Sequence, residues 1–373
     1  MSTRRTEYLD LPIVAAGNRR SLVVHHYGHG RPKAYLQAAL HADEWPGILA
    51  LQHLLSLLDA APEAVRGEIV IVPFANPIGL AQFVHTALLG RYDFDLTGNF
   101  NRAIPPLGQR LVVALADQLG ADPTANAALI RSALREQVMT LPVQREAEAL
   151  KALLLSQSID ADYVIDIHCD HSALLHLYAP RDQTALAEQL AFDLECRVLL
   201  LEDDPGGDAF DQANSSPWRV LRQHYGSRIP QGCFACTLEL RGQSDVDDTL
   251  AAHDAAGLYR FLQGQGLIAG APSAATTLHG VSVPLEGVDV LRSPSAGLLV
   301  YRQALGAYVN AGDVIAEVLD VEAVNQRTPI CSRTDGLMFT QVRDQWVRPG
   351  QTIAKIAGLT PLDYRRPGTL LQD

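Results

Sequence analysis

The sequence predicts an α/β protein in which a mixed sheet lies between helices and is followed by a small all-β domain. Two observations lead to this prediction. Up to about residue 270, apolar runs of strand length alternate with longer stretches of helical spacing, which is typical of a largely parallel or mixed sheet. Beyond residue 280 the helical spacing stops, and one sequence pattern occurs twice.

The expected strands are short runs of aliphatic and β-branched residues that end at turn-forming residues. One long helix is expected over 47–60, and residues 107–158, rich in Ala, Leu, Gln and Glu, are mostly helical in pattern. The strand segments are SLVVHHYG (21–28), AYLQAAL (34–40), GEIVIVPFANPIG (67–79, ended by Asn76-Pro77 and Gly79), ADYVIDIHCD (161–170), ECRVLLLE (195–202) and CFACTLELRG (233–242).

Composition narrows the class of protein. Apolar residues make up 47% of the 373 residues and charged residues 19%, the balance of a soluble globular protein. The formal net charge of −12 argues against non-specific nucleic-acid binding. The sequence contains neither an apolar stretch long enough to span a membrane nor a secretory signal. Its five cysteines are scattered and odd in number, so no disulfide framework is expected and the cytoplasm is the expected location.

The repeated pattern lies at the C-terminal end of the chain. Residues 295–318 match residues 334–356, and each copy runs from Gly-Leu through an apolar strand to V-x-x-G-x-x-I-A. A period near 39 residues indicates two hairpin-like copies related by pseudo-two-fold symmetry. A small-residue, turn-rich segment over 270–280 is expected to link this part to the rest.

Three side chains are candidates for metal ligands. His41 ends an apolar run, Glu44 follows three residues later, and Pro46 suits the first turn of a helix. This pair alone is equally compatible with a polar strand end. His168, near the end of another apolar run, supplies a third ligand, and catalytic zinc commonly takes two histidines and a glutamate. We therefore expect one zinc ion per chain on His41, Glu44 and His168.

Two carboxylates in strands are further candidates. Asp166 lies two residues before His168 and faces the same side, so it either lines the site, orients a ligand or caps a neighbouring loop. Glu239 stands between Leu238 and Leu240 and points away from both, as a site residue would; a charge on a solvated sheet face is the alternative. Cys233 and Cys236 are interpreted as packing residues, and His171 as a cleft residue rather than a ligand.

Several motifs follow one another in a fixed order. After His-x-x-Glu come VPFANPIG (72–79), RYDFDLTGNFNRAIPP (91–106), the single histidine at a strand end, and CTLELRG (236–242). Together they resemble the zinc carboxypeptidase superfamily, and within it the aspartoacylase/succinylglutamate desuccinylase branch. The resemblance covers roughly residues 20–360, and a β-rich C-terminal domain is also a property of this branch.

The resemblance implies a zinc-carboxypeptidase-like mixed sheet flanked by helices, and it assigns roles position by position. Glu239 matches the general base, and Arg91 matches the arginine that polarises the scissile carbonyl. Asn101 and Arg102 match the pair that holds a substrate carboxylate. The D-L-N-R pattern is not intact, because extra residues separate Asp95 from the Asn-Arg pair. This longer spacing affects the role of Arg91 more than that of Arg102.

The expected domains are a zinc hydrolase domain over 1–272 with a helical insertion over about 107–158, a β-rich domain over 280–360, and a tail over 361–373. The β-rich domain resembles biotinyl/lipoyl-type sandwiches. Their modified lysine is missing from LDVEAVNQRTPICS (319–332), so a structural or access-shaping role is expected.

The function that the sequence favours is zinc-dependent hydrolysis of the amide bond of a small N-acylated amino acid. Zinc-bound water is the expected nucleophile and Glu239 its general base. The expected partner is a small-molecule amide that carries a carboxylate, with no nucleic acid and no membrane; a homo-oligomer is left open. A metallocarboxypeptidase acting on peptide C-termini is the alternative, followed by a non-catalytic binding protein on the same fold.

Overall fold

The computed structural model describes the chain except for residues 1–3, 96–97, 204, 274–276 and 372–373, so part of the expected linker over 270–280 lies outside the described residues. The chain divides into two compact units. The first comprises Met1–His168, Gly207–Thr237 and Val246–Ala274, and the second comprises Cys169–Gly206, Leu238–Asp245 and Ala275–Asp373.

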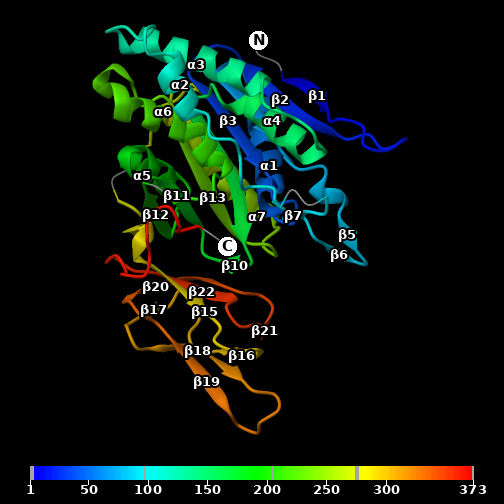
Figure 1. Cartoon of the computed structure of the whole chain (residues 1–373), viewed down its shortest axis with the longest axis vertical. Helices are drawn as coiled ribbons and strands as arrows, with labels where there is room; N and C mark the ends of the chain where they lie inside the picture. The colour runs from blue at the N-terminus through cyan, green and yellow to red at the C-terminus, as the bar shows by residue number, and fades with distance from the viewer. Residues whose placement is uncertain (1–3, 96–97, 204, 274–276, 372–373) are drawn as a thin grey trace. The chain divides into compact units, whose positions relative to one another are not determined.

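A mixed sheet forms the centre of the first unit (Figure 1). Its strands follow in the order β1-β2-β4-β3-β9-β13; β1, β2 and β4 pair antiparallel, whereas β3 runs parallel to both β4 and β9. These strands are β1 Arg5–Asp10, β2 Ser21–Gly28, β3 Lys33–Ala38, β4 Glu68–Val72, β9 Tyr163–Asp170 and β13 Phe234–Gly242. The short hairpins between β4 and the insertion are β5 Phe83–Val84, β6 Ala87–Leu88, β7 Tyr92–Asp93 and β8 Gly98–Asn99.

Helices cover both faces of this sheet, because successive side chains of each strand point to opposite faces. Tyr35 and its neighbour Val164 belong to one core cluster with the helices of the insertion and α6. Tyr163, on the other face, contacts Phe261 of α7 edge to face at 5.9 Å between ring centroids. The helices are α1 Pro46–Ala60, α2 Gly108–Ala114, α3 Pro123–Met139, α4 Glu146–Ser158, α6 Phe210–Tyr225 and α7 Asp248–Gly264.

The expected fold class is therefore confirmed at the level of a large mixed sheet flanked by helices. The predicted helix over 47–60 is α1, and the insertion folds as α2, α3 and α4. Strand β3 ends at Ala38, short of the predicted end at residue 40, whereas β9 continues beyond His168 to Asp170.

The second unit contains three parallel strands and an antiparallel part. The parallel strands follow in the order β11-β12-β14, with α5 against the first two. The antiparallel part has one sheet in the order β10-β20-β22-β15, with β17 on β20, and another in the order β19-β18-β16-β21. The unit's elements are β10 Ser172–Ala173, β11 His176–Pro180, α5 Thr184–Asp193, β12 Val198–Glu202, β14 Val281–Pro284, β15 Val288–Arg292, β16 Gly297–Tyr301, β17 Tyr308–Val309, β18 Val314–Leu319, β19 Arg327–Cys331, β20 Gly336–Gln341, β21 Trp346–Val347 and β22 Thr352–Ala357.

The two copies of the sequence repeat fold alike. The first forms β16, β17 and β18, the second forms β20, β21 and β22, and in each the outer two strands pair antiparallel. The short middle strand of each copy pairs with the first strand of the other, β17 with β20 and β21 with β16. One apolar cluster contains residues of both sheets, such as Leu299, Val318, Met338 and Ile356. The resemblance to biotinyl/lipoyl sandwiches stays a prediction.

Within the described residues, none of the helices combines the length and the apolar composition that crossing a membrane requires.

Candidate metal centre

The turn that carries His41 leaves the sheet abruptly. Ala39, directly after β3, adopts the left-handed conformation with φ of 58°, which is costly for a residue other than glycine and reverses the path of the chain. The Ala42 amide then donates to the Gly90 carbonyl at 3.0 Å, and the Glu44 amide donates to the His41 carbonyl at 3.1 Å. Pro46 begins α1, so His41 and Glu44 project from one tight turn between a strand and a helix.

Two glycines allow this turn to pack closely. A Cβ atom on Gly90 would lie 2.6 Å from the Asp43 amide nitrogen, and one on Gly47 would lie 2.7 Å from Cγ2 of Ile167. Contacts of that length exclude any side chain at either position unless the turn shifts. Gly90 therefore holds the turn from one side, and Gly47 allows the start of α1 to contact β9.

His168 reaches the same place because of the strand order. Strands β3 and β9 are parallel neighbours, with Ala38 beside Ile167, so their carboxyl ends meet at one edge of the sheet. His168 is the next residue of β9, and His41 stands three residues beyond the end of β3. Two segments more than 100 residues apart in the sequence thus bring their histidines together, with ring centroids 4.9 Å apart.

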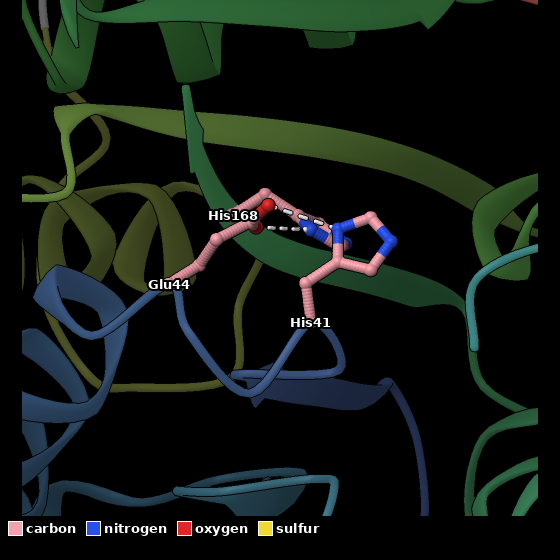
Figure 2. A group of neighbouring side chains, drawn as sticks. All are labelled: His41, Glu44 and His168. Atoms are coloured by element: carbon pink, nitrogen blue, oxygen red, sulfur yellow. Dashed lines mark hydrogen bonds and ion pairs between the residues drawn. The ribbon is translucent and has the colours of Figure 1, made fainter. Parts of the chain in front are cut away.

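Glu44 lies between the two imidazoles (Figure 2). Its Oε1 atom is 2.9 Å from Nδ1 of His41, and its Oε2 atom is 2.7 Å from Nδ1 of His168. The three side chains are buried, with exposures of 3%, 4% and 3% in chain order. One ligand atom from each lies within 4.8 Å of the others, which groups the three as a candidate metal site.

The outer nitrogen of each ring faces an oxygen acceptor. Nε2 of His41 is 2.8 Å from Oδ1 of Asn99, an oxygen that also accepts a bond from the Asn101 amide. Nε2 of His168 is 2.9 Å from Oδ2 of Asp166, whose other oxygen accepts from Gln37 at 2.8 Å. The amide oxygen of Asn99 places the ring proton of His41 on Nε2 and leaves its Nδ1 lone pair directed at Glu44, whereas Nδ1 of His168 faces the other oxygen of Glu44.

Charge and burial set the protonation of this group. Burial lowers the pKa of His41, against the opposing effect of Glu44, so this imidazole is neutral near pH 7. Burial alone would lower the pKa of His168, but the carboxylates of Asp166 and Glu44 raise it well above its usual value. Burial alone would raise the pKa of Glu44, but the two histidines hold it well below its usual value, so Glu44 is ionised.

These side chains fit a divalent metal ion. With its single proton on Nε2, His41 directs the lone pair of Nδ1 at a carboxylate oxygen only 2.9 Å away, and Nη1 of Arg91 lies 3.0 Å from that oxygen and 3.2 Å from Nδ1, so both atoms face positive charge. Two imidazole nitrogens and a carboxylate are a usual ligand set of catalytic zinc, and the acceptors on Nε2 are the usual means of orienting such histidines.

Arg91 and Asn101, both predicted site residues, lie beside this group. Nη1 of Arg91 donates to Oε1 of Glu44 at 3.0 Å and lies 3.2 Å from Nδ1 of His41. The Asn101 amide nitrogen lies 3.2 Å from Nε2 of His168, and its Oδ1 atom accepts from the Phe210 amide at 2.8 Å. The Asn101 side chain and the Asp166 carboxylate thus both contact Nε2 of His168.

Arg102 and Glu239, the other two predicted site residues, are both half-buried. Arg102 is half-buried next to Asn101, and its Nη1 donates to the Asn101 carbonyl at 2.8 Å. Glu239 is half-buried in β13 between the buried Leu238 and Leu240, which matches the alternation expected from the sequence. Cys236 is buried in the same strand and Cys233 is buried directly before it, as their interpretation as packing residues requires.

Sequence reasoning missed two polar residues of the site. Asn99 orients His41, and the only available signal was its position two residues before Asn101, which puts both side chains on one side of an extended segment. Asp211, at the start of α6, is buried, and burial together with the charge of Asp166 raises its pKa. Nothing in the local sequence marks Asp211, since α6 is brought here by the fold.

Comparisons with known proteins find relatives of this chain. The model of the succinylglutamate desuccinylase/aspartoacylase catalytic domain matches residues 31–127, which include the turn of His41. An N-alpha-acetyl-L-2,4-diaminobutyric acid deacetylase of Halomonas elongata is 26% identical over an alignment of 347 residues, and the match covers 87% of this chain and 82% of that protein.

Two solved structures resemble the whole chain. A succinylglutamate desuccinylase/aspartoacylase family protein of Shewanella amazonensis superimposes with a TM-score of 0.84 at 26% identity and covers 95% of this chain and 98% of its own. A second structure, of a protein of this family from Shewanella frigidimarina, has a TM-score of 0.87 at 23% identity and covers 97% and 100%.

The helix-flanked mixed sheet and its buried His-Glu-His group define an α/β protein with a candidate site for a single divalent ion at the carboxyl edge of its strands. Residues 31–127 match the catalytic-domain model of the succinylglutamate desuccinylase/aspartoacylase family, and the whole chain is similar to proteins of that family, as its sequence motifs indicated.

Proposed function

We propose that this protein is a zinc-dependent amidohydrolase that removes the acyl group from a small N-acylated amino acid. The observation that supports this most strongly is the group formed by His41, Glu44 and His168. Their three ligand atoms converge within 4.8 Å, both outer ring nitrogens are oriented, and the carboxylate is ionised in a buried site. One zinc ion per chain is proposed there.

A zinc ion on these residues would supply a water of pKa about 7 and a Lewis acid for the amide carbonyl. Glu239 is proposed to accept the proton of the attacking water and to pass it to the departing nitrogen. The new C–O bond then replaces the C–N bond, and the products are a carboxylate and an amino group. The half-buried position of Glu239, with buried leucines on either side in β13, supports this role.

Arg91 is proposed to donate to the carbonyl oxygen as negative charge develops on it. Its guanidinium, 40% exposed, already reaches the ligand set through Glu44, so it combines access from solvent with contact to the centre. Asn101 and Arg102 are proposed to bind the carboxylate of the amino-acid part, since an amide and a planar guanidinium fork match two carboxylate oxygens.

The substrate class rests on both the site and a relative. The deacetylase of Halomonas elongata is named for a small acetylated amino acid, which supports a substrate of that class here. The domain boundaries given above, a cytoplasmic location and a homo-oligomer remain predictions.

A substrate panel tests this function. The full chain, stripped of metal by a chelator and reloaded with one equivalent of zinc, should hydrolyse N-acetyl or N-succinyl amino acids. The stripped protein should be inactive. Hydrolysis of C-terminal dipeptides alone would establish the metallocarboxypeptidase instead. A zinc-loaded protein that cleaves none of these amides would support the non-catalytic binding protein and contradict the proposal.

Glu239→Gln provides the sharper test of the mechanism. The amide cannot accept the proton of the attacking water, so kcat should fall by about 10²- to 10⁴-fold. Zinc content should stay at the wild-type value, because Glu239 is not a proposed ligand. Wild-type kcat in a zinc-loaded Glu239→Gln protein would remove Glu239 from the mechanism.

A further inference from the structure

The chain has few lysines, and their side chains are buried or half-buried. Of the 30 basic residues, 3 are lysines, and none of them is exposed. Lys33 bonds to Asp160 at 2.7 Å and Lys355 bonds to Asp170 at 2.8 Å, which are ion pairs. Lys151 differs, because its Nζ atom donates to a backbone carbonyl, that of Arg102, at 2.7 Å.

Lys151 is a charged residue in a buried position, and burying a charge costs free energy. Its side chain belongs to α4 and the residue is only 8% exposed. Burial lowers the pKa of Lys151, while the carboxylates of Asp93 and Glu148 act in the opposite direction. An apolar side chain would fill the same place without desolvating a charge. The contact with Arg102 is therefore the feature that distinguishes a lysine from a leucine at this position.

The segment that Lys151 holds is the one next to the candidate centre. Asn99 and Asn101 direct their side chains at His41 and His168, while Phe100 between them is buried in the main apolar cluster. On its far side the segment is fixed by loop 207–210, to which the amides of Ala103 and Ile104 donate at 3.3 and 3.0 Å. Lys151 adds a fixed point at the Arg102 carbonyl.

A second contact of the insertion reaches the same region of the chain. Arg145, directly before α4, donates to the Asp95 carbonyl at 2.9 Å. The insertion thus contacts the chain before the Asn99–Arg102 segment and at its last residue. The Arg145 contact is exposed, whereas the Lys151 contact is half-buried and reaches a predicted substrate-binding residue.

We propose that Lys151 is a positioning residue for substrate recognition, whose ammonium group fixes the Arg102 carbonyl so that Asn101 and Arg102 hold the carboxylate of the substrate. Through Lys151, the helical insertion holds the Asn99–Arg102 segment in place; we call this contact the bracing. The identity of the ligand rests on the proposed function, whereas the bracing does not.

Hydrogen exchange of the full chain tests the bracing without any substrate. Lys151→Met keeps the length of the side chain and removes the donor. In zinc-loaded protein, the amides of a peptide spanning 98–104 should exchange at least about tenfold faster than in the wild type, the factor expected for one lost charged hydrogen bond. Lys33→Met, the matched control, removes a buried ammonium elsewhere and should leave this peptide unchanged.

Kinetics with two substrates test the recognition. For an N-acetyl amino acid, Lys151→Met should raise KM about tenfold and change kcat by less than about threefold. The corresponding carboxamide should be affected much less, so the preference for the free acid falls. Lys151→Gln, which keeps a neutral donor, should restore part of this preference, and it replaces the Met variant if that protein does not fold.

The outcomes separate the two proposals. Wild-type exchange over 98–104 in a folded Lys151→Met protein would overturn the bracing. Faster exchange with an unchanged preference for the free acid would overturn the role in recognition. If the wild type cleaves neither substrate, the proposed function fails, and the exchange experiment still decides whether Lys151 fixes this segment.

Discussion

The two imidazoles of the candidate centre are oriented by different acceptors. His41 faces the neutral amide oxygen of Asn99, whereas His168 faces the carboxylate of Asp166, which is fully buried and also accepts from Gln37. A carboxylate on the outer nitrogen makes the imidazole a more basic ligand than an amide does. Asp166 is therefore the residue through which the affinity for the metal can be changed without removing a ligand.

We predict that Asp166→Asn weakens zinc binding by about 10- to 100-fold, the usual cost of losing such a partner. The volume of the side chain is conserved, so the fold should remain. Competition with a chromophoric chelator measures the change. Asp10→Asn, on the exposed strand β1, is the control. Equal zinc affinity in Asp166→Asn and the wild type would show that Asp166 does not orient His168.

Arg91 gives a second prediction for a single residue. Arg91→Met removes the donor to Glu44 and to the proposed carbonyl oxygen, so kcat should fall by about 10²- to 10³-fold. Because Arg91 is not a ligand, the zinc content should be retained. Steady-state kinetics together with metal analysis measure both. An Arg91→Met protein with the wild-type kcat would leave the sequence-based role of Arg91 without support.

For the site residues, sequence reasoning predicted the group through spacing and strand ends. His41 and Glu44 share one turn, so their proximity follows from local geometry, and His168 follows from the rule that parallel strands present their carboxyl ends together. Asn99 was not predicted because its role depends on the path of a segment without regular structure. Asp211 was not predicted because it comes from a helix that is distant in the sequence.

At the scale of elements, the centre depends on how closely the turn after β3 approaches the segment that contains Gly90. The Gly90 carbonyl accepts from the Ala42 amide, and a Cβ atom on Gly90 would lie 2.7 Å from Cβ of Ala42. The turn that carries His41 and Glu44 is thus packed directly against Gly90 and cannot move towards it. Stability and metal binding should change together when this contact is disturbed.

We predict that Gly90→Ala lowers the free energy of unfolding by about 1–3 kcal/mol, the usual cost of overpacking, and weakens zinc binding because the turn must move. Urea unfolding of the metal-free protein and chelator competition measure the two effects. Gly120→Ala is the matched control, because no atom lies within 4 Å of the added Cβ there. A Gly90→Ala protein as stable as Gly120→Ala would contradict the close packing of the turn.

The elements themselves were largely predictable from the sequence. Strands β2, β4, β9, β12 and β13 and helix α1 follow from apolar runs and spacing, because one buried face imposes a period on the sequence. The short hairpins between Phe83 and Asn99 carry no such period. Each has two-residue strands and exposed apolar side chains, such as Phe83 and Tyr92, so their conformation depends on tertiary contacts.

At the scale of the molecule, the repeat predicted two similar hairpins in the C-terminal part, and the structure adds how they pair. Two equal copies with one buried cluster lead to reciprocal pairing, in which each middle strand completes the sheet of the other copy. The division into two compact units, which cuts β9 after His168 and β13 after Thr237, has no signal in the sequence, since it depends on contacts between distant segments.

A buried histidine of the second unit should make stability depend on pH. His176 is fully buried, and its Nδ1–H donates to the Leu174 carbonyl at 2.8 Å. Burial and then the charge of Lys355 lower the pKa of His176 to about 4, against the weaker effect of Asp170. Because the folded pKa lies below the unfolded value of 6.5, the stabilisation is complete above pH 6.5 and is lost as the pH falls towards 4.

We predict that His176→Asn, which keeps a donor but does not titrate, flattens this dependence. The difference of 6.5 − 4 pKa units corresponds to about 3 kcal/mol. Between pH 7 and pH 4, the wild type should therefore lose about 3 kcal/mol more unfolding free energy than His176→Asn, as measured by urea denaturation of metal-free protein. His29→Asn, at an exposed position, should behave as the wild type. Equal losses in all three proteins would contradict the buried neutral state of His176.

The central claim is that His41, Glu44 and His168 together hold one zinc ion. Anomalous diffraction at the zinc edge from crystals of the zinc-loaded full chain tests it most directly. We expect one strong peak per chain, bounded by the Nδ1 atoms of His41 and His168 and the carboxylate of Glu44. A site without anomalous density in zinc-loaded crystals, or a peak bound by other residues, would contradict it.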